Sequence, residues 1–429
     1  MKILLKNARL LSEYGFGQES VCLAVEDAYI TYVGKEEPAG PFDRTVDCRE
    51  NLVMPAFYNA HCHASMTIFR GYANGLPLHT WLNDKIFPAE ERLNDERVYW
   101  GAKLAVAEMI RNGIASFSDM YMFEESVARA VAESGIKANL SRSLVSFGEN
   151  ATIVGDHRFA EAERLLKRYH ESCDGKIRVD MSLHAEYTNT MPYCREVAAF
   201  AKEQGVGIQV HVSETEKEHK ECLARHGLTP TAFLAEAGVL DVPVTAAHCV
   251  WLDESDLDIM QGKRVSIVHN PVSNLILGSG IMPLTRYLKK DINVALGTDG
   301  VASNNTLDVL KEMQIAGLLA KGSTRQADAL SEETIIAMAT VNGALAQGRT
   351  DCGKIREGFR ADLILMDMEA IHNVPCYHLE NAVAYSLHSS DVLMTMVDGR
   401  ILFENGEYTS IDIEQLRFEF DRMQKHYFD

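Results

Sequence analysis

Residues 53–63 have the sequence VMPAFYNAHCH, in which an apolar run over residues 53–61 ends in His61 and is followed by Cys62 and His63. A short apolar run of this kind predicts a buried β-strand. Because side chains alternate along a strand, His61 and His63 project to one side and Cys62 projects to the other. We therefore predict a strand whose end presents two imidazoles to a common site, with Cys62 as a small core residue.

Seven further apolar runs follow, and segments of helical length separate them. The runs are residues 114–119, 138–144, 177–184, 207–211, 244–248, 265–270 and 293–299. Helical periodicity is present in residues 96–112, 124–134 and 158–170. Eight strand-and-helix units of this size predict an α/β fold with a (β/α)8 TIM-like barrel. A doubly wound open sheet is the alternative, but no glycine-rich phosphate-binding sequence follows the first strand.

Both ends of the chain have a different pattern, that of short strands and tight turns. The strand-like runs are residues 2–11, 20–33, 361–366 and 392–403. Glu26-Asp27 and Asp398-Gly399 are the turn signals within them. Neither end has enough strands for a stable sheet of its own. We therefore predict that residues 1–52 and 355–429 form one small β-sandwich domain beside a barrel of residues 53–354.

Composition restricts the partners and the location of the protein. The 429 residues have a formal net charge of −19 and no block of Lys and Arg, which disfavours nucleic acid and anionic membranes as partners. Charged residues interrupt the N-terminus too early for a signal peptide, and no apolar run has transmembrane length. The nine cysteines include no Cys-x-x-Cys pair. We expect a cytoplasmic protein with reduced thiols that acts on a small molecule; barrels of this kind often form homo-oligomers.

Ligand-type residues recur at the ends of the predicted strands. Five of the eight runs end in such a residue, namely His61, His184, His211, His248 and Asp299. The carboxyl ends of barrel strands form the active site, and packing does not explain polar residues at the same point of successive strands. Neutral imidazoles with a carboxylate suit Zn²⁺ and also Fe²⁺. The pattern predicts a metal site, at which bound water would become acidic enough to act as a nucleophile.

Glu214 adds a carboxylate three residues after His211, where the strand has ended. It could act as a general acid and base beside the metal. Alternatively, it is a solvated residue at the start of a helix over residues 214–225, where the helix dipole favours negative charge. Taken alone, its position does not decide between these interpretations.

Several of these segments together resemble the amidohydrolase superfamily. They are Asn59-Ala60-His61-Cys62-His63, His211 with Glu214, His248, and Gly297-Thr298-Asp299. The resemblance spans essentially the whole chain, including residues 354–366. A closer resemblance is to the branch that contains S-adenosylhomocysteine and 5′-methylthioadenosine deaminases and chlorohydrolases. It is carried by Phe69-Arg70-Gly71, Trp81-Leu82, Phe87-Pro88-Ala89-Glu90 and residues 270–275, NPVSNL.

The resemblance implies a hydrolytic deaminase that converts an adenosine-type nucleoside to the inosine derivative and ammonia. The implied ligands of one divalent metal are His61, His63, His211 and Asp299. Asp299 would also take a proton from the attacking water, His248 would hydrogen-bond to its oxygen, and Glu214 would protonate the ring nitrogen and then the leaving amine. Binuclear relatives bridge two metals with a modified Lys on the fourth strand. No Lys follows Lys176 on that strand here, so we expect one metal.

Four further residues acquire substrate-binding roles from the resemblance. Glu90 would hold the ribose hydroxyls, His184 would face the purine, and Arg142 and Arg158 would grip an amino-acid tail bidentately. Each arginine could instead be a solvated surface charge. The branch often has His-Ala-Pro-Tyr after the fourth strand, whereas this chain has Glu186 in place of the proline.

Four other functions are alternatives to this interpretation. A deaminase of guanine- or pterin-type bases and a triazine-type chlorohydrolase are compatible with the same ligand set. A cytidine-deaminase-type zinc site is excluded, because no second Cys follows Pro192-Tyr193-Cys194 at the required spacing. A non-enzymatic assembly protein on the same barrel need not keep ligands, yet every expected metal position is filled.

Overall fold

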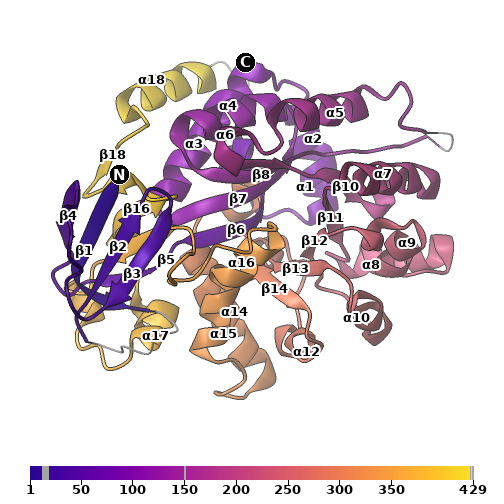
Figure 1. Ribbon diagram of the computed structural model, residues 1–429. Helices are drawn as coiled ribbons and strands as arrows, with labels where there is room; N and C mark the ends of the chain where they lie inside the picture. The colour runs from indigo at the N-terminus through magenta and orange to yellow at the C-terminus, as the bar shows by residue number, and fades with distance from the viewer. Residues whose placement is uncertain (12–18, 149–150, 426, 428–429) are drawn as a thin grey trace.

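The computed structural model describes residues 1–11, 19–148, 151–425 and 427. A barrel of parallel strands lies at its centre, with helices around it (Figure 1). The barrel strands are β6 (Phe57–Cys62), β7 (Ile114–Tyr121), β8 (Lys137–Arg142), β9 (Ile177–Val179) with β10 (Met181–Ala185), β11 (Ile208–Val212), β12 (Val244–His248), β13 (Val265–His269) and β14 (Asn293–Leu296). The backbone N–H of Asp299 donates to the His61 carbonyl at 3.0 Å and joins the last strand to the first. The predicted (β/α)8 barrel is confirmed.

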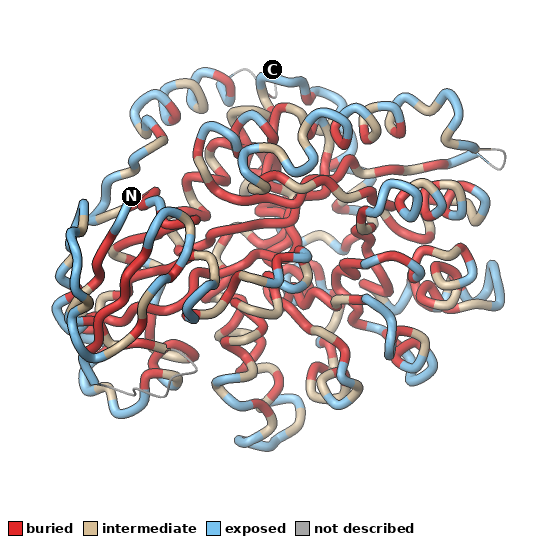
Figure 2. Tube along the Cα trace, viewed as in Figure 1, coloured by how far each residue is buried: buried red, intermediate tan, exposed pale blue. Residues whose placement is uncertain are grey.

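The helices that follow the strands pack outside the barrel. They include α3 (Asp95–Arg111), α4 (Glu124–Ser134), α5 (His157–Tyr169), α7 (Met191–Gln204), α8 (Glu216–His226), α9 (Pro230–Glu236), α10 (Glu254–Met260) and α14 (Val309–Thr324). Burial is concentrated along the strands and the inner faces of these helices (Figure 2). No helix among the described residues is both long and apolar enough to cross a membrane.

Strands from the two chain ends share one nine-stranded sheet. Its order is β18-β17-β16-β15-β5-β1-β2-β3, with β4 paired to β1. The strands are β1 (Lys2–Leu10), β2 (Val21–Glu26), β3 (Tyr29–Gly34), β4 (Arg44–Asp47), β5 (Leu52–Pro55), β15 (Leu363–Met366), β16 (Val392–Val397), β17 (Arg400–Glu404) and β18 (Glu407–Tyr408). A separate apolar core forms between them, to which both ends contribute. Residues 12–18, 426 and 428–429 of the predicted end domain lie outside the described residues.

The structure has the two predicted tight turns, but it divides one of the predicted strands. Asp27 and Asp398 have positive φ angles of 53° and 46° in the tight turns expected there. The single strand expected over residues 53–61 is wrong, because the chain divides it: β5 pairs antiparallel with β15, and the barrel begins only at Phe57. Both pieces are fully buried, so hydrophobicity does not mark the break between them.

Candidate metal centre and active site

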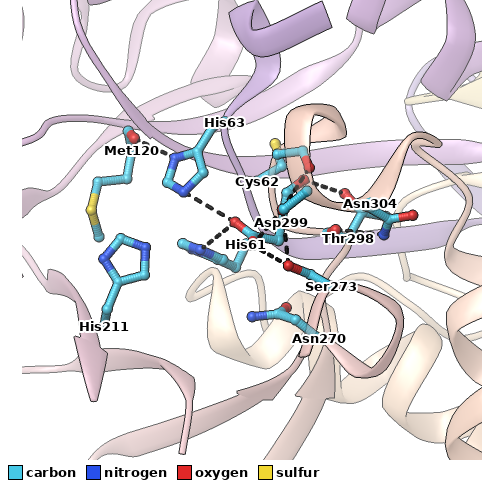
Figure 3. Close-up of polar contacts among 12 residues, drawn as sticks. His61, Cys62, His63, Met120, His211, Asn270, Ser273, Thr298, Asp299 and Asn304 are labelled. Atoms are coloured by element: carbon cyan, nitrogen blue, oxygen red, sulfur yellow. Dashed lines mark hydrogen bonds and ion pairs between the residues drawn. The ribbon is translucent and has the colours of Figure 1, made fainter. Parts of the chain in front are cut away.

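Four candidate ligands meet at the carboxyl end of the barrel. His61 lies in β6 one residue before its end, His63 follows that strand, His211 lies in β11, and Asp299 follows β14. The ring centroid of His61 lies 4.9 Å from that of His63 and 4.9 Å from that of His211. Asp299 Oδ1 lies 3.1 Å from His63 Nε2 and 3.6 Å from His61 Nε2. The barrel therefore brings together side chains from three distant parts of the sequence (Figure 3).

Hydrogen bonds to the backbone orient two of these imidazoles. The Nδ1–H of His63 donates to the Met120 carbonyl at 2.7 Å, and that of His211 donates to the His184 carbonyl at 2.6 Å. Each bond selects the tautomer that leaves Nε2 with a free lone pair. His61 Nε2 is buried and has no hydrogen-bond partner. Three ring nitrogens are thus available to a cation.

The two carboxylate oxygens of Asp299 contact different partners. Its backbone has a positive φ of 58°, uncommon for a residue other than glycine. Oδ2 accepts a hydrogen bond from Ser273 Oγ at 2.6 Å (Figure 3) and another from Ser303 Oγ at 3.0 Å. Oδ1 is left to face the histidines.

The chemistry of this donor set fits a divalent cation. Burial lowers the pKa of His61 to about 4 and lowers that of His211 well below its ordinary value, so both are neutral near pH 7. Neutral imidazole and carboxylate are the ligands that zinc takes in hydrolytic sites. Ligand atoms of His61, His63 and Asp299 all lie within 4.8 Å of one another, as do those of His61, His211 and His248. An orphaned, buried His61 nitrogen is also what a metal site would explain.

Glu214 and His248 lie beside these ligands. Glu214 Oε2 is 3.9 Å from His248 Nε2, and its Oε1 accepts a hydrogen bond from Ser279 Oγ at 3.1 Å. The Nδ1 of His248 hydrogen-bonds to Asn274 Oδ1 at 2.8 Å. Burial raises the pKa of Glu214, which favours the protonated carboxyl group that a proton donor needs.

A cavity of about 450 Å³ is lined by three of the candidate ligands, His63, His211 and Asp299. Its lining includes Glu90, Arg142, Arg158, His184 and Glu214 together with apolar side chains. The apolar lining includes Leu78, Trp81, Leu82, Ile86, Phe87, Met120, Met122, Phe147 and Leu277. Cavities of this size, mostly apolar with a few convergent polar groups, typically bind small organic ligands.

Glu90 is another carboxylate that lines this cavity. Its Oε1 accepts a hydrogen bond from Tyr121 Oη at 2.6 Å. Burial raises its pKa to about 7, and the hydrogen bond from Tyr121 acts in the opposite direction. Glu90 is therefore positioned to accept hydrogen bonds from hydroxyl groups of a bound ligand.

The two arginines of the cavity are already engaged by acidic neighbours. Arg142 is buried, and its Nε donates to Glu161 Oε2 at 2.6 Å. Arg158 lies at the start of α5 and is more exposed, with its Nη1 3.9 Å from Asp156 Oδ1. Both line the same wall of the site, but Arg142 is held far more firmly.

His184 lies beside His211, with ring centroids 5.0 Å apart, and it lines the cavity. Glu186, which follows two residues later, does not line it: its buried carboxylate faces the last turn of α8, where His226 Nε2 is 3.2 Å from Oε1. The carboxylate of Glu186 therefore pairs with α8 and does not line the cavity.

Several residues of the site had no assigned role in the sequence analysis. Ser273 and Asn274 lie in the NPVSNL segment, which was noted only as a mark of resemblance. Tyr121, Ser279 and Ser303 carry no signal in the sequence, because serine and tyrosine are common residues and only the fold brings these three to the site.

The chain is similar to known proteins both in sequence and in structure. The amidohydrolase family matches residues 52–402. The chain is 41% identical to a 5-methylthioadenosine/S-adenosylhomocysteine deaminase of Acetivibrio thermocellus, over 99% of both chains. It is 40% identical to a 5′-deoxyadenosine deaminase of Methanothermobacter thermautotrophicus, over 94% of both. A solved adenosine deaminase from Xanthomonas campestris with bound zinc has a TM-score of 0.92 and 29% identity, covering 99% of this chain and 98% of that one.

Proposed function

The chain belongs to the amidohydrolase family, and from this premise we propose that it is a metal-dependent deaminase of adenosine-type nucleosides. The substrates are 5′-methylthioadenosine and S-adenosylhomocysteine. In the reaction, water adds to the amine-bearing carbon of the purine, the carbon–nitrogen bond breaks, and ammonia leaves with the inosine derivative as the other product.

One divalent cation, zinc, is held by His61, His63, His211 and Asp299 in this proposal. The cation supplies Lewis acidity, which lets water act as a nucleophile near neutral pH. Burial favours the neutral form of His61 and His211, whose imidazoles then offer lone pairs to a metal. The absence of any Lys on β9 and β10 supports a single cation.

The proton transfers are assigned to residues of the chain itself. Glu214, with its raised pKa, delivers a proton to the ring nitrogen and then to the leaving amine. His248, fixed through Nδ1 by Asn274, directs Nε2 toward the reacting oxygen. Asp299 receives the proton lost by water, and Ser273 and Ser303 keep the carboxylate oriented while it does so.

One observation carries the choice of a nucleoside over a free base. A single cavity is lined by three of the candidate ligands and by Glu90, together with many apolar side chains. A free base offers Glu90 no hydroxyl group beyond its hydrogen bond from Tyr121, whereas a ribose offers it two. The apolar wall suits a 5′ thioether, and Arg142 and Arg158 suit the carboxylate of the longer substrate.

Ammonia release from purified protein tests the proposal. The substrates compared are 5′-methylthioadenosine, S-adenosylhomocysteine, 5′-deoxyadenosine, guanine, a pterin and a chlorinated triazine, the last followed by chloride release. The nucleosides are expected to react with the highest kcat/KM. Activity on guanine, the pterin or the triazine alone would contradict the nucleoside assignment and leave only the metal-dependent hydrolase.

We also propose a cytoplasmic location. All nine cysteines are free thiols and most are buried, which suits a reducing compartment.

A further inference from the structure

The turn that carries Glu214 is strained, and it needs support from outside. Ser213, the residue before Glu214, has a positive φ of 46° although it is not glycine. Such a backbone costs roughly 1–3 kcal/mol and persists only where neighbouring groups hold it. Both residues are buried, so water does not stabilise their backbone N–H groups.

Glu218 meets both of these N–H groups. Its Oε1 accepts a hydrogen bond from the Ser213 N–H at 2.9 Å, and its Oε2 accepts one from the Glu214 N–H at 2.7 Å. Glu218 is itself buried, with 4% of its surface exposed. One carboxylate therefore binds two successive peptide groups, which fixes their orientation as well as their position.

This contact departs from ordinary helix capping. Residues 215–218, TEKE, have the capping-box pattern, in which the third helical residue reaches back to the N-terminal cap. Thr215 Oγ1 does accept the Glu218 N–H at 3.1 Å. The Glu218 carboxylate, however, passes the cap residue and binds the two residues before it. Helix stability alone does not account for that choice.

We propose that Glu218 is a positioning residue for the reaction: its carboxylate holds the Ser213–Glu214 turn so that Glu214 reaches the substrate ring nitrogen. The assignment rests on the proposed role of Glu214. The opposite end of Glu214 is held by Ser279, so the two contacts together define where the side chain points. Burial and the nearby Glu214 raise the pKa of Glu218 to about 8, whereas the hydrogen bonds from the Ser213 and Glu214 N–H groups act in the opposite direction and favour the carboxylate.

Glu218→Gln tests this inference in the metal-loaded enzyme. The amide keeps one acceptor and presents an N–H₂ group to the other backbone N–H, so one bond is lost and the turn shifts. A misplacement of about 1 Å can lower turnover by about 10²-fold. We expect kcat to fall about 10- to 10²-fold, with KM and metal content within twofold of the wild-type values.

Thr215→Ala is the matched control. It removes the side-chain cap of the same helix, at a cost of about 1 kcal/mol, but leaves the carboxylate contacts in place. We expect this variant to lose stability and keep its kcat. If Glu218→Gln does not fold, Glu218→Asp replaces it, because the shorter carboxylate reaches at most one N–H group and kcat should still fall.

The outcomes separate this inference from the proposed function. An active wild-type enzyme with unchanged kcat in Glu218→Gln, or in Glu218→Asp where the amide variant does not fold, overturns the role of Glu218 alone. Equal losses of kcat in Glu218→Gln and Thr215→Ala also overturn it, because both would then act through helix stability. If the wild-type protein deaminates a free base instead of nucleosides, the nucleoside assignment fails while the same comparison still tests Glu218. A protein without any aminohydrolase activity overturns both.

Discussion

Glu186 accepts hydrogen bonds from Arg225 Nη2 through both carboxylate oxygens, at 2.9 and 2.8 Å. The carboxylate is almost fully buried, whereas 40% of the Arg225 side chain is exposed. The pair joins the loop after β10 to the last turn of α8. That loop carries Tyr187, which lines the cavity, and its Thr188 hydrogen-bonds to His184 of β10, which lines the cavity too.

Arg225→Ala should destabilise the protein, because it removes a partner from a buried charge. We expect a loss of about 1–3 kcal/mol in the free energy of unfolding, measured with urea. KM for nucleosides should rise, since the loop that positions His184 and Tyr187 is no longer held. Arg195→Ala is the control: its pair with Glu236 is exposed at both ends and should contribute less than about 1 kcal/mol. Equal effects of the two substitutions would contradict the assigned role of the buried pair.

Glu186→Pro should relieve the dependence on Arg225. Proline is favourable at the first position of a helical turn, and Glu186 begins the short 3-10 helix of residues Glu186–Thr188 after an extended Ala185. We expect Glu186→Pro/Arg225→Ala to be more stable than Arg225→Ala alone. A double variant that is less stable than the single one would show that the proline does not fit this loop.

Glu214→Gln should abolish most turnover and leave the metal content unchanged. The substitution keeps the shape and removes proton transfer, which is typically worth about 10²–10⁴-fold. His248→Asn should also lower kcat more than it lowers stability. Metal analysis and single-turnover kinetics on the same preparations check both expectations. Near-normal turnover in either variant would contradict the role given to that residue.

Removal of the metal should lower both activity and thermal stability. The site contains a buried His61 nitrogen without a partner, so a bound cation stabilises only the folded state. We expect a chelator to lower Tm and abolish ammonia release, and one equivalent of Zn²⁺ per chain to restore both. Two tightly bound metals per chain, or full activity after complete removal, would contradict the single-cation proposal.

Two substitutions in the cavity should separate the substrates. Glu90→Ala should lower kcat/KM for both 5′-methylthioadenosine and S-adenosylhomocysteine, because both contain the ribose. Arg142→Ala should reduce activity only on S-adenosylhomocysteine, the substrate with a carboxylate. Arg164→Ala, an exposed arginine on the same helix as Arg158, is the control. Loss of activity on both nucleosides in Arg142→Ala would point to a structural role through Glu161 instead.

The pH dependence of stability should include a contribution from Glu90. Burial raises its pKa from an ordinary 4.5 to about 7, so the folded protein keeps a proton that the unfolded chain releases in this interval. The free energy of unfolding contributed by this group therefore falls as pH rises from 4.5 through 7. Glu90→Gln should flatten that part of the profile, measured by urea unfolding at several pH values. An unchanged slope would contradict the raised pKa.

The sequence predicted the strand ends well, because apolar runs that terminate in His or Asp are visible without a structure. It did not predict where the chain leaves the end sheet and enters the barrel. The strands on the two sides of this point, Leu52–Pro55 and Phe57–Cys62, are both fully buried. Nor did it predict the groups that hold the site residues in place. Asn274, Ser279 and Glu218 act through contacts made by the fold, and their residue types alone indicate no partner.

The sheet built from both chain ends has a consequence for synthesis on the ribosome. β5 pairs with β1 on one side and with β15 on the other, and β15 is translated only after every barrel strand. Until then the nascent chain carries a complete set of barrel strands beside an open, apolar strand edge, which is a site for aggregation. A premature stop codon after residue 354 would thus spare every candidate metal ligand and still yield a chain that associates through that edge.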